Sequence, residues 1–217
     1  MRPLLSLVPF VALACASGKD DPAPEGWPEG LEPVIDCAVD APGSEELGDT
    51  PELLNLESEE GEPGWVCAHA WIQAPVADVW AAFQDDDVVV DRRAVAEWTI
   101  AREDDPAFDV GFVIHNVVHD VVTVEFDITW NEGVVVGTAA DPEHVAITFE
   151  KTDGTPFIHL LDGSVQLYAF DEATTELILA ERLHGATGGI EDAVGYITDL
   201  YADALASAHG EALPTYD

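Results

Sequence analysis

The sequence predicts an α+β fold, because its strand-like and helix-like segments fall in separate blocks along the chain. Residues 65–73 alternate like a strand, and residues 75–83 then place apolar side chains at helical spacing. A run of segments rich in β-branched and aromatic residues follows, and the chain closes with one long amphipathic segment. Strands and helices do not alternate regularly, so the order argues against a parallel β-α-β repeat.

The stretch "GWVCAHAWIQ" predicts the first strand of the globular part. Its side chains divide between two faces, with Trp65, Cys67, His69 and Trp71 on one and Val66, Ala68, Ala70 and Ile72 on the other. Pro75 then suits the first turn of a helix, where no hydrogen bond is lost. One apolar stripe at i, i+3, i+4 and i+7 supports that helix: Val76, Val79, Trp80 and Phe83.

The middle of the chain predicts a meander of strands. In "VVTVEFDITW", apolar residues from Val122 to Trp130 alternate with polar ones, which indicates one dry and one wet face. "KTDGTP" and "DEATT" separate the later strand-like segments and have good turn compositions. The stretch "RRAVAEWTI" is ambiguous and could be helical.

The C-terminal segment predicts a long amphipathic helix. Its apolar stripe comprises Ile190, Ala193, Val194, Ile197, Tyr201, Ala204 and Leu205. Glu191 and Asp192 would lie near the positive end of the helix dipole, where acidic side chains are stabilising.

The N-terminus is typical of a bacterial export signal over residues 1–14. Arg2 supplies the positive charge, and residues 4–14 form an apolar stretch shorter than the roughly 20 residues of a transmembrane helix. "ALAC" resembles the lipobox of bacterial lipoproteins, with Cys15 as the lipid-modified residue, although Ala12 stands where that motif prefers Leu. We therefore expect an exported protein of the cell envelope that is anchored to a membrane by its lipid only; ordinary signal-peptidase cleavage is the alternative.

Residues 15–64 are expected to form an acidic, proline-rich tether, because low hydrophobicity with like charge favours an unpacked chain. Within it, "PELLNL" could form one helical turn. The remaining cysteines, Cys37 and Cys67, are predicted to form a disulfide after export, with two buried free thiols as the alternative. The globular domain is expected over residues 65–210, followed by a short tail over 211–217.

The charge of the chain limits its partners. Seven Lys and Arg residues against 44 Asp and Glu residues give a formal net charge of −37. Such a surface repels phosphate backbones and anionic lipid headgroups, so nucleic acid is not an expected partner. A saline habitat explains the acidity more simply than a cationic partner does.

Metal-binding and nucleophilic motifs are weak. His115 and His119 in "HNVVH" have helical zinc spacing, but the segment reads as a strand, which would hold the two side chains roughly 13 Å apart. "DGS" at Ser164 lacks the residues of a nucleophile elbow. We expect no metal, no cofactor and no catalytic residue that the sequence can name.

The strand that ends in "IQAPVADVWAAFQD" resembles the START-like, or SRPBCC, superfamily, whose members often place a small residue, a proline and an xVW-type helix after their first strand. The resemblance covers about residues 65–210. It implies a helix-grip fold, in which a curved antiparallel sheet grips a long C-terminal helix around a cavity for an apolar ligand. The superfamily includes lipid binders and cyclases, so the resemblance does not imply an enzyme.

If that architecture holds, six residues are candidates for lining the cavity: Trp130, His159, Tyr168, Glu181, Ile197 and Tyr201. Each could instead be an ordinary core residue, and the alternation leaves open which sheet face looks inward. Three functions stay open. The first is non-catalytic binding or transfer of a small hydrophobic molecule, such as a lipid. The second is a scaffold whose cavity is filled by side chains, and the third is a cyclase- or hydrolase-like enzyme in which Glu181 and His159 form an acid–base pair.

Overall fold

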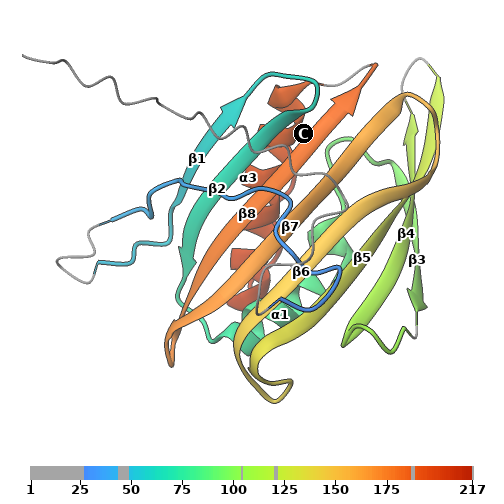
Figure 1. Ribbon diagram of the computed structural model, residues 1–217. Helices are drawn as coiled ribbons and strands as arrows, with labels where there is room; N and C mark the ends of the chain where they lie inside the picture. Colours follow the sequence, from blue (N-terminus) through green and yellow to red (C-terminus); the bar gives the residue numbers. More distant parts are fainter. Residues whose placement is uncertain (1–26, 44–48, 104, 120–121, 187–188, 217) are drawn as a thin grey trace, which may run out of the picture.

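An eight-stranded antiparallel sheet wraps around the C-terminal helix in the computed structural model (Figure 1). The structure describes residues 27–43, 49–103, 105–119, 122–186 and 189–216. The strand order is β1-β2-β8-β7-β6-β5-β4-β3, and every neighbouring pair is antiparallel. The predicted α+β helix-grip architecture is confirmed.

The strands are β1 (Leu54–Glu59), β2 (Gly64–Ile72), β3 (Glu97–Glu103), β4 (Val110–His119), β5 (Thr123–Thr138), β6 (Asp141–Gly154), β7 (Ile158–Asp171) and β8 (Thr174–Gly185). The helices are α1 (Val76–Phe83), α2 (Asp86–Val89) and α3 (Ile190–Ala208). Both predicted amphipathic helices are present, as α1 and α3. The ambiguous stretch "RRAVAEWTI" is a turn followed by the start of β3.

The core lies between the inner face of the sheet and the three helices. On β2 the inner face carries Val66, Ala68, Ala70 and Ile72, all fully buried. From α3, Ile197 and Ala204 are fully buried, and the Tyr201 hydroxyl donates a hydrogen bond to the Trp71 carbonyl at 3.1 Å. Burying one such aliphatic side chain contributes about 1.5–3 kcal/mol, so this stripe holds the helix to the sheet.

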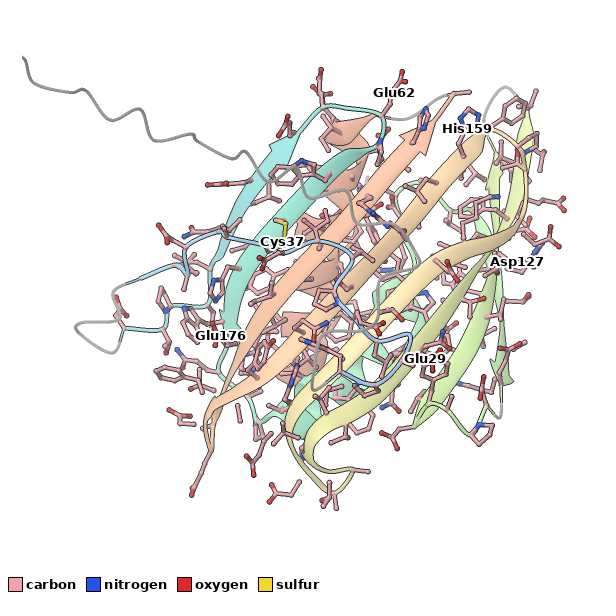
Figure 2. The ribbon with its side chains drawn as sticks, viewed as in Figure 1. Glu29, Cys37, Glu62, Asp127, His159 and Glu176 are labelled. Atoms are coloured by element: carbon pink, nitrogen blue, oxygen red, sulfur yellow. A yellow bond between two sulfur atoms is a disulfide. The ribbon has the colours of Figure 1, made fainter. Side chains whose placement is uncertain are left out.

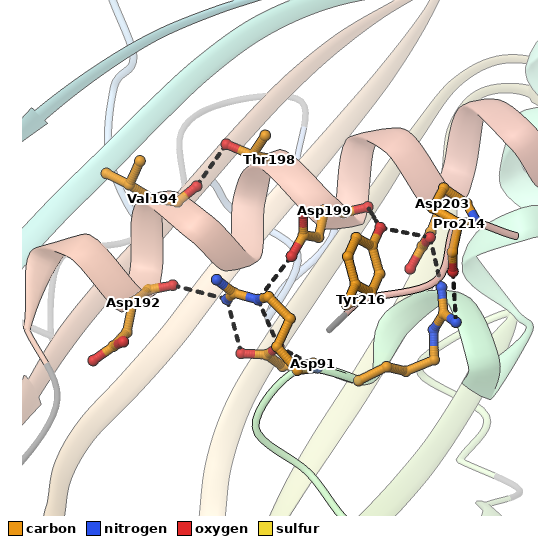
Figure 3. Close-up of polar contacts among 10 residues, drawn as sticks. Asp91, Asp192, Val194, Thr198, Asp199, Asp203, Pro214 and Tyr216 are labelled. Carbon is orange, nitrogen blue, oxygen red and sulfur yellow. Dashed lines mark hydrogen bonds and ion pairs between the residues drawn. The ribbon is translucent and has the colours of Figure 1, made fainter.

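Two consecutive arginines bind the loop after α2 to the outer side of α3 (Figure 3). Arg92 Nη2 lies 2.7 Å from Asp203 Oδ1, and Arg93 Nε lies 2.7 Å from Asp199 Oδ2. Arg93 can approach because position 195 is glycine: a Cβ there would overlap the guanidinium. These pairs fix α3 from the side that does not face the sheet.

The predicted tether requires a correction over its described part. Residues 27–43 run across the outer face of the sheet (Figure 1), where Leu31 is only 1% exposed and the Val34 amide donates to Ser164 Oγ. The predicted disulfide between Cys37 and Cys67 is present, with Cα atoms 5.6 Å apart, and attaches this segment to β2. The burial of a few apolar residues and one covalent bond thus hold this segment against the sheet, although its composition favours an unpacked chain. Residues 15–26, including Cys15, lie outside the described residues, as do residues 1–14.

The domain also extends beyond both predicted boundaries. "PELLNL" leads into strand β1, not into a helical turn, because pairing with β2 satisfies its backbone groups. The tail after α3 folds back on the helix: the Tyr216 hydroxyl donates to Asp203 Oδ1 at 2.8 Å, and the Pro214 carbonyl accepts from Arg92 at 3.0 Å. Among the described residues, no helix is long and apolar enough to cross a membrane.

Candidate functional site

One row of side chains crosses the inner face of the sheet from edge strand β3 to β2. Strand register places its members directly opposite one another in the order Arg102, Phe112, Trp130, Phe149, Gly163, Glu181 and Val66. We call these residues the inner row. They lie on the sheet face that packs against α1 and α3.

The middle of the inner row is aromatic. Trp130 stacks between Phe112, at a centroid distance of 6.0 Å, and Phe149, at 4.5 Å. Phe149 in turn meets Tyr196 of α3 edge to face at 6.2 Å, and its ring covers Gly163, where a Cβ would overlap it. Trp130 is 1% exposed, yet its Nε1 has no hydrogen-bond partner among the described residues.

A buried carboxyl group, Glu132, follows Trp130 on the same face of β5. Its Oε2 accepts a hydrogen bond from Trp80 Nε1 of α1 at 2.6 Å, whereas its Oε1 has no partner in the described part of the chain. Burial raises the pKa of Glu132 to about 8, against the smaller opposing effects of the Trp80 hydrogen bond and the Arg102 charge. At neutral pH this side chain is therefore mainly a neutral carboxylic acid that can donate a hydrogen bond.

A second buried carboxyl group, Glu181, lies in the inner row on β8, between Gly163 and Val66. It is 2% exposed, and its Oε2 is likewise unpaired within the described ranges. Burial raises the pKa of Glu181 well above its ordinary value, and the charges of Asp91 and Asp162 raise it further. The inner face thus carries two buried carboxyl groups whose pKa values burial raises, one beside Trp130 on β5 and the other opposite Gly163 on β8.

Side chains of β3 close the edge of the grip against the short helices. Trp98 Nε1 donates to Asp86 Oδ2 of α2 at 2.9 Å, and Arg102 Nη2 donates to the Gln84 carbonyl at 2.7 Å. The Arg102 guanidinium also lies 4.7 Å from the centre of the Phe112 ring. Arg102 itself is exposed, so this edge of the grip borders solvent.

The structure places four of the six predicted cavity residues on the inner side and two elsewhere. Trp130, Glu181, Ile197 and Tyr201 face the space between sheet and helices. Tyr168 is on the outer face, where its ring stacks on His144 at 4.1 Å. His159 is exposed at the end of β7 (Figure 2), with its ring 4.9 Å from that of His184. Glu181 and His159 are therefore not brought together, and the acid–base pair considered for an enzyme does not form.

Sequence reasoning missed Glu132, Phe112, Phe149 and Trp80 as site residues. The signal for Glu132 was available: the alternation of "FDITWNE" continues two residues beyond Trp130 and places Glu132 on the same face. An acidic residue that follows an apolar stretch of strand is usually expected to be exposed to solvent. The burial of Glu132 becomes apparent only from its contact with Trp80 in the folded structure.

The two histidines of "HNVVH" lie on strand β4, as expected, and each meets a different carboxylate. His115 Nδ1 is 2.7 Å from Asp127, and His119 Nε2 is 3.4 Å from Glu97. Within the described residues, no group of three or more His, Cys, Asp or Glu side chains is arranged to hold a metal ion.

Comparison with known proteins places this architecture in the START-like, helix-grip class. The lipid transfer and protein localization domain of human StarD13 (DLC2) is similar at 10% identity, with a TM-score of 0.52, over 74% of this chain and 86% of that one. Human StAR-related lipid transfer protein 5 is similar at 9% identity, with a TM-score of 0.50, over 75% and 85%. At these identities the likeness shows the fold alone, and the chain has a START-like (SRPBCC) fold. No protein-family model and no curated protein matches the sequence.

Proposed function

We propose that the protein binds a small hydrophobic molecule with one polar group, such as a lipid or an apolar metabolite, against the inner row, without catalysing a reaction. The observation that carries this proposal is the set of buried, unpaired polar atoms on an otherwise apolar face: Trp130 Nε1, Glu132 Oε1 and Glu181 Oε2. Buried polar atoms in proteins almost always have a partner, so such atoms are expected to meet a polar group or water inside the grip. Both human structures described above belong to proteins named for lipid transfer, which supports the same class of ligand.

The chemistry of these atoms limits the ligand's polar group. The Trp130 indole can only donate, and a protonated Glu132 can donate from one oxygen and accept at the other. A hydroxyl or carbonyl group satisfies this pair, whereas a cationic group would meet no fixed negative charge there. The absence of a His159–Glu181 contact favours binding over acid–base catalysis.

The scaffold function is the second candidate, and the aromatic stack favours it. Phe112, Trp130 and Phe149 are each at most 2% exposed and fill much of the centre of the grip. A ligand must then either be small or displace the Phe149 ring over Gly163. The two candidates therefore differ in one measurable property, which is whether an apolar molecule enters the interior.

The experiment is native mass spectrometry of the exported protein before and after extraction with organic solvent. It is followed by titration with 1-N-phenylnaphthylamine, a neutral probe that the acidic surface does not repel. A stoichiometric extracted molecule, or saturable probe binding that the extract displaces, supports the binder. Trp130→Phe should weaken that binding, whereas Trp65→Phe on the outer face should not. A protein that carries no molecule and does not bind the probe would favour the scaffold.

The proposal also concerns location: the domain is held at a bacterial membrane by lipid on Cys15. The Cys37–Cys67 bond supports export, because disulfides persist in oxidising compartments. Trp27, the first described residue, contacts His144, and about 12 residues separate it from Cys15, a length of chain that spans at most roughly 40 Å. Intact mass of the protein made in a bacterium should show acyl chains on an N-terminal Cys15. Cleavage elsewhere, or an unmodified Cys15, would contradict the anchor.

A further inference from the structure

A separate pocket lies on the outer face of the sheet, away from the inner row. Its volume is about 250 Å³, and it is bounded by β2, β7, β8 and four described residues that precede β1. The lining residues are Ala41, Pro42, Asp49, Thr50, Trp71, Phe170 and Glu176. Figure 2 shows Glu176 on the face over which residues 27–43 run. The proposed function of the grip leaves this pocket without a role.

Two aromatic rings form one part of the pocket wall. Trp71 and Phe170 meet edge to face, with ring centroids 5.0 Å apart. The Trp71 indole is held in place by a hydrogen bond from Nε1 to the Pro42 carbonyl at 2.9 Å. Phe170 is 52% exposed, so much of its ring surface remains accessible from solvent.

Two acidic residues, Asp49 and Glu176, also line the pocket, and no Lys or Arg is among its described lining residues. Glu176 Oε1 is 2.7 Å from His69 Nε2, while His69 Nδ1 is 2.9 Å from the Val39 carbonyl. Both ring nitrogens of His69 thus lie within hydrogen-bond distance of oxygen atoms. Asp49 and Glu176 make the described lining of the pocket acidic.

We propose that this outer pocket binds a small organic monocation with a methylated ammonium group. Aromatic faces attract such cations through the ring quadrupole, and a nearby carboxylate adds a charge contact. The net charge of −37 raises the local concentration of any cation at this surface. A headgroup that joins ammonium to phosphate fits less well, because Asp49 and Glu176 would repel the phosphate. The ligand is therefore a free cation.

Several contacts hold the described residues next to the pocket. The disulfide at Cys37 anchors the covering segment at one end. Asn55 Nδ2 donates to the Asp40 carbonyl at 2.8 Å, and the Gln73 amide donates to Glu52 Oε1 at 2.8 Å, on either side of the pocket-forming residues. Contacts that position lining residues in advance lower the conformational entropy lost on binding, which favours affinity for a small ligand.

The test is isothermal titration of the full exported protein at low ionic strength with choline and tetramethylammonium. The matched control ligand is 3,3-dimethylbutan-1-ol, which has the shape of choline without its charge. We expect both cations to bind saturably and the neutral alcohol to bind at least about tenfold more weakly. Phe170→Leu and Asp49→Asn should each lower choline affinity by about three- to tenfold. Phe157→Leu and Glu143→Gln, which change the same residue types at exposed positions outside the pocket, should leave it unchanged.

Three results would overturn the proposal: no saturable binding of either cation, equal affinity for the neutral alcohol, or unchanged affinity in both pocket variants. Competition by phosphatidylcholine vesicles as effective as that by choline would overturn the assignment to a free cation. Phe170→Leu should bind 1-N-phenylnaphthylamine as the unaltered protein does. A negative result for cation binding in the outer pocket is therefore distinguishable from a negative result for ligand binding at the inner row.

Discussion

Among single residues, Glu132 shows most directly how the burial of a carboxyl group makes the stability of the fold depend on pH. Its pKa of about 8 lies above the ordinary value of 4.5, so between these values the folded protein holds a proton that the unfolded chain has released. The contribution of Glu132 to stability is therefore complete below pH 4.5 and declines as pH rises towards 8. The decline has a limiting slope of roughly 1.4 kcal/mol per pH unit.

Glu132→Gln should remove this decline, because the amide stays neutral and can still accept from Trp80. Chemical denaturation at about pH 5 and about pH 8 should show that the unaltered protein loses several kcal/mol more than the variant between the two. Glu143→Gln, a change at an exposed position, should keep the original profile. Parallel profiles for Glu132→Gln and the unaltered protein would contradict the buried, protonated carboxyl.

Gly163 supports the aromatic stack by having no side chain. A Cβ at this position would overlap the Phe149 ring and approach the Ala180 carbonyl to 2.6 Å, and the backbone cannot easily yield within a paired strand. Gly163→Ala should therefore lower the free energy of unfolding by about 1–3 kcal/mol, as overpacking does in other cores. In a protein that already carries Phe149→Leu, Gly163→Ala should lower the free energy of unfolding by a smaller amount. An equal cost in both backgrounds would show that Phe149 is not the obstacle.

Alternation in the sequence predicted that each strand has two faces, but it did not determine the surroundings of every side chain. Trp130, Glu181, Ile197 and Tyr201 lie inside, but Tyr168 faces outward because alternation defines two faces and does not say which one is covered. His159 lies at an irregularity in β7, between Ile158 and Leu160, where the side-chain pattern shifts. Side-chain contacts between strands decide such cases, and a single sequence does not contain them.

At the scale of elements, the pair formed by Arg92 and Asp203 fastens α3. The Asp203 side chain is 2% exposed, and the Arg92 side chain is 18% exposed, so solvent screens this pair only weakly. Arg92→Met should lower the free energy of unfolding by about 3 kcal/mol, because it leaves a buried carboxylate with only Tyr216 as a partner. Adding Asp203→Asn should recover part of this loss in urea denaturation. If the free energy of unfolding of Arg92→Met lay within about 0.5 kcal/mol of that of the original protein, the pair would contribute no more than a weak surface ion pair does.

The elements themselves were largely predictable, since α1, α3 and the central strands have strong periodicity. β1 and the segment over residues 27–43 were not, because their proline and acid content is typical of an unpacked chain. These segments are packed because β1 pairs with the edge of β2, because the disulfide attaches residues 27–43 to β2, and because a few side chains such as Leu31 are buried. All of these interactions exist only in the folded molecule.

For the whole molecule, the charge imbalance should make stability depend on salt. With a net charge of −37, folding brings like charges together, and arginines such as Arg92 and Arg93 compensate them only locally. Raising NaCl from about 0.1 M to about 1 M shortens the screening length from about 10 Å to about 3 Å, less than the spacing of many surface carboxylates.

We therefore expect added NaCl to raise the unfolding temperature by at least about 2–4 °C, which corresponds to roughly 1 kcal/mol for a chain of this size. NaCl is preferred to sulfate, which stabilises proteins generally by exclusion from their surface. Sucrose at matched osmolality separates screening from such exclusion and should give a smaller rise. Equal effects of the two solutes would mean that repulsion between surface carboxylates does not limit stability. The acidity would then need an explanation other than adaptation to salt, and the outer pocket for cations would be the first place to look.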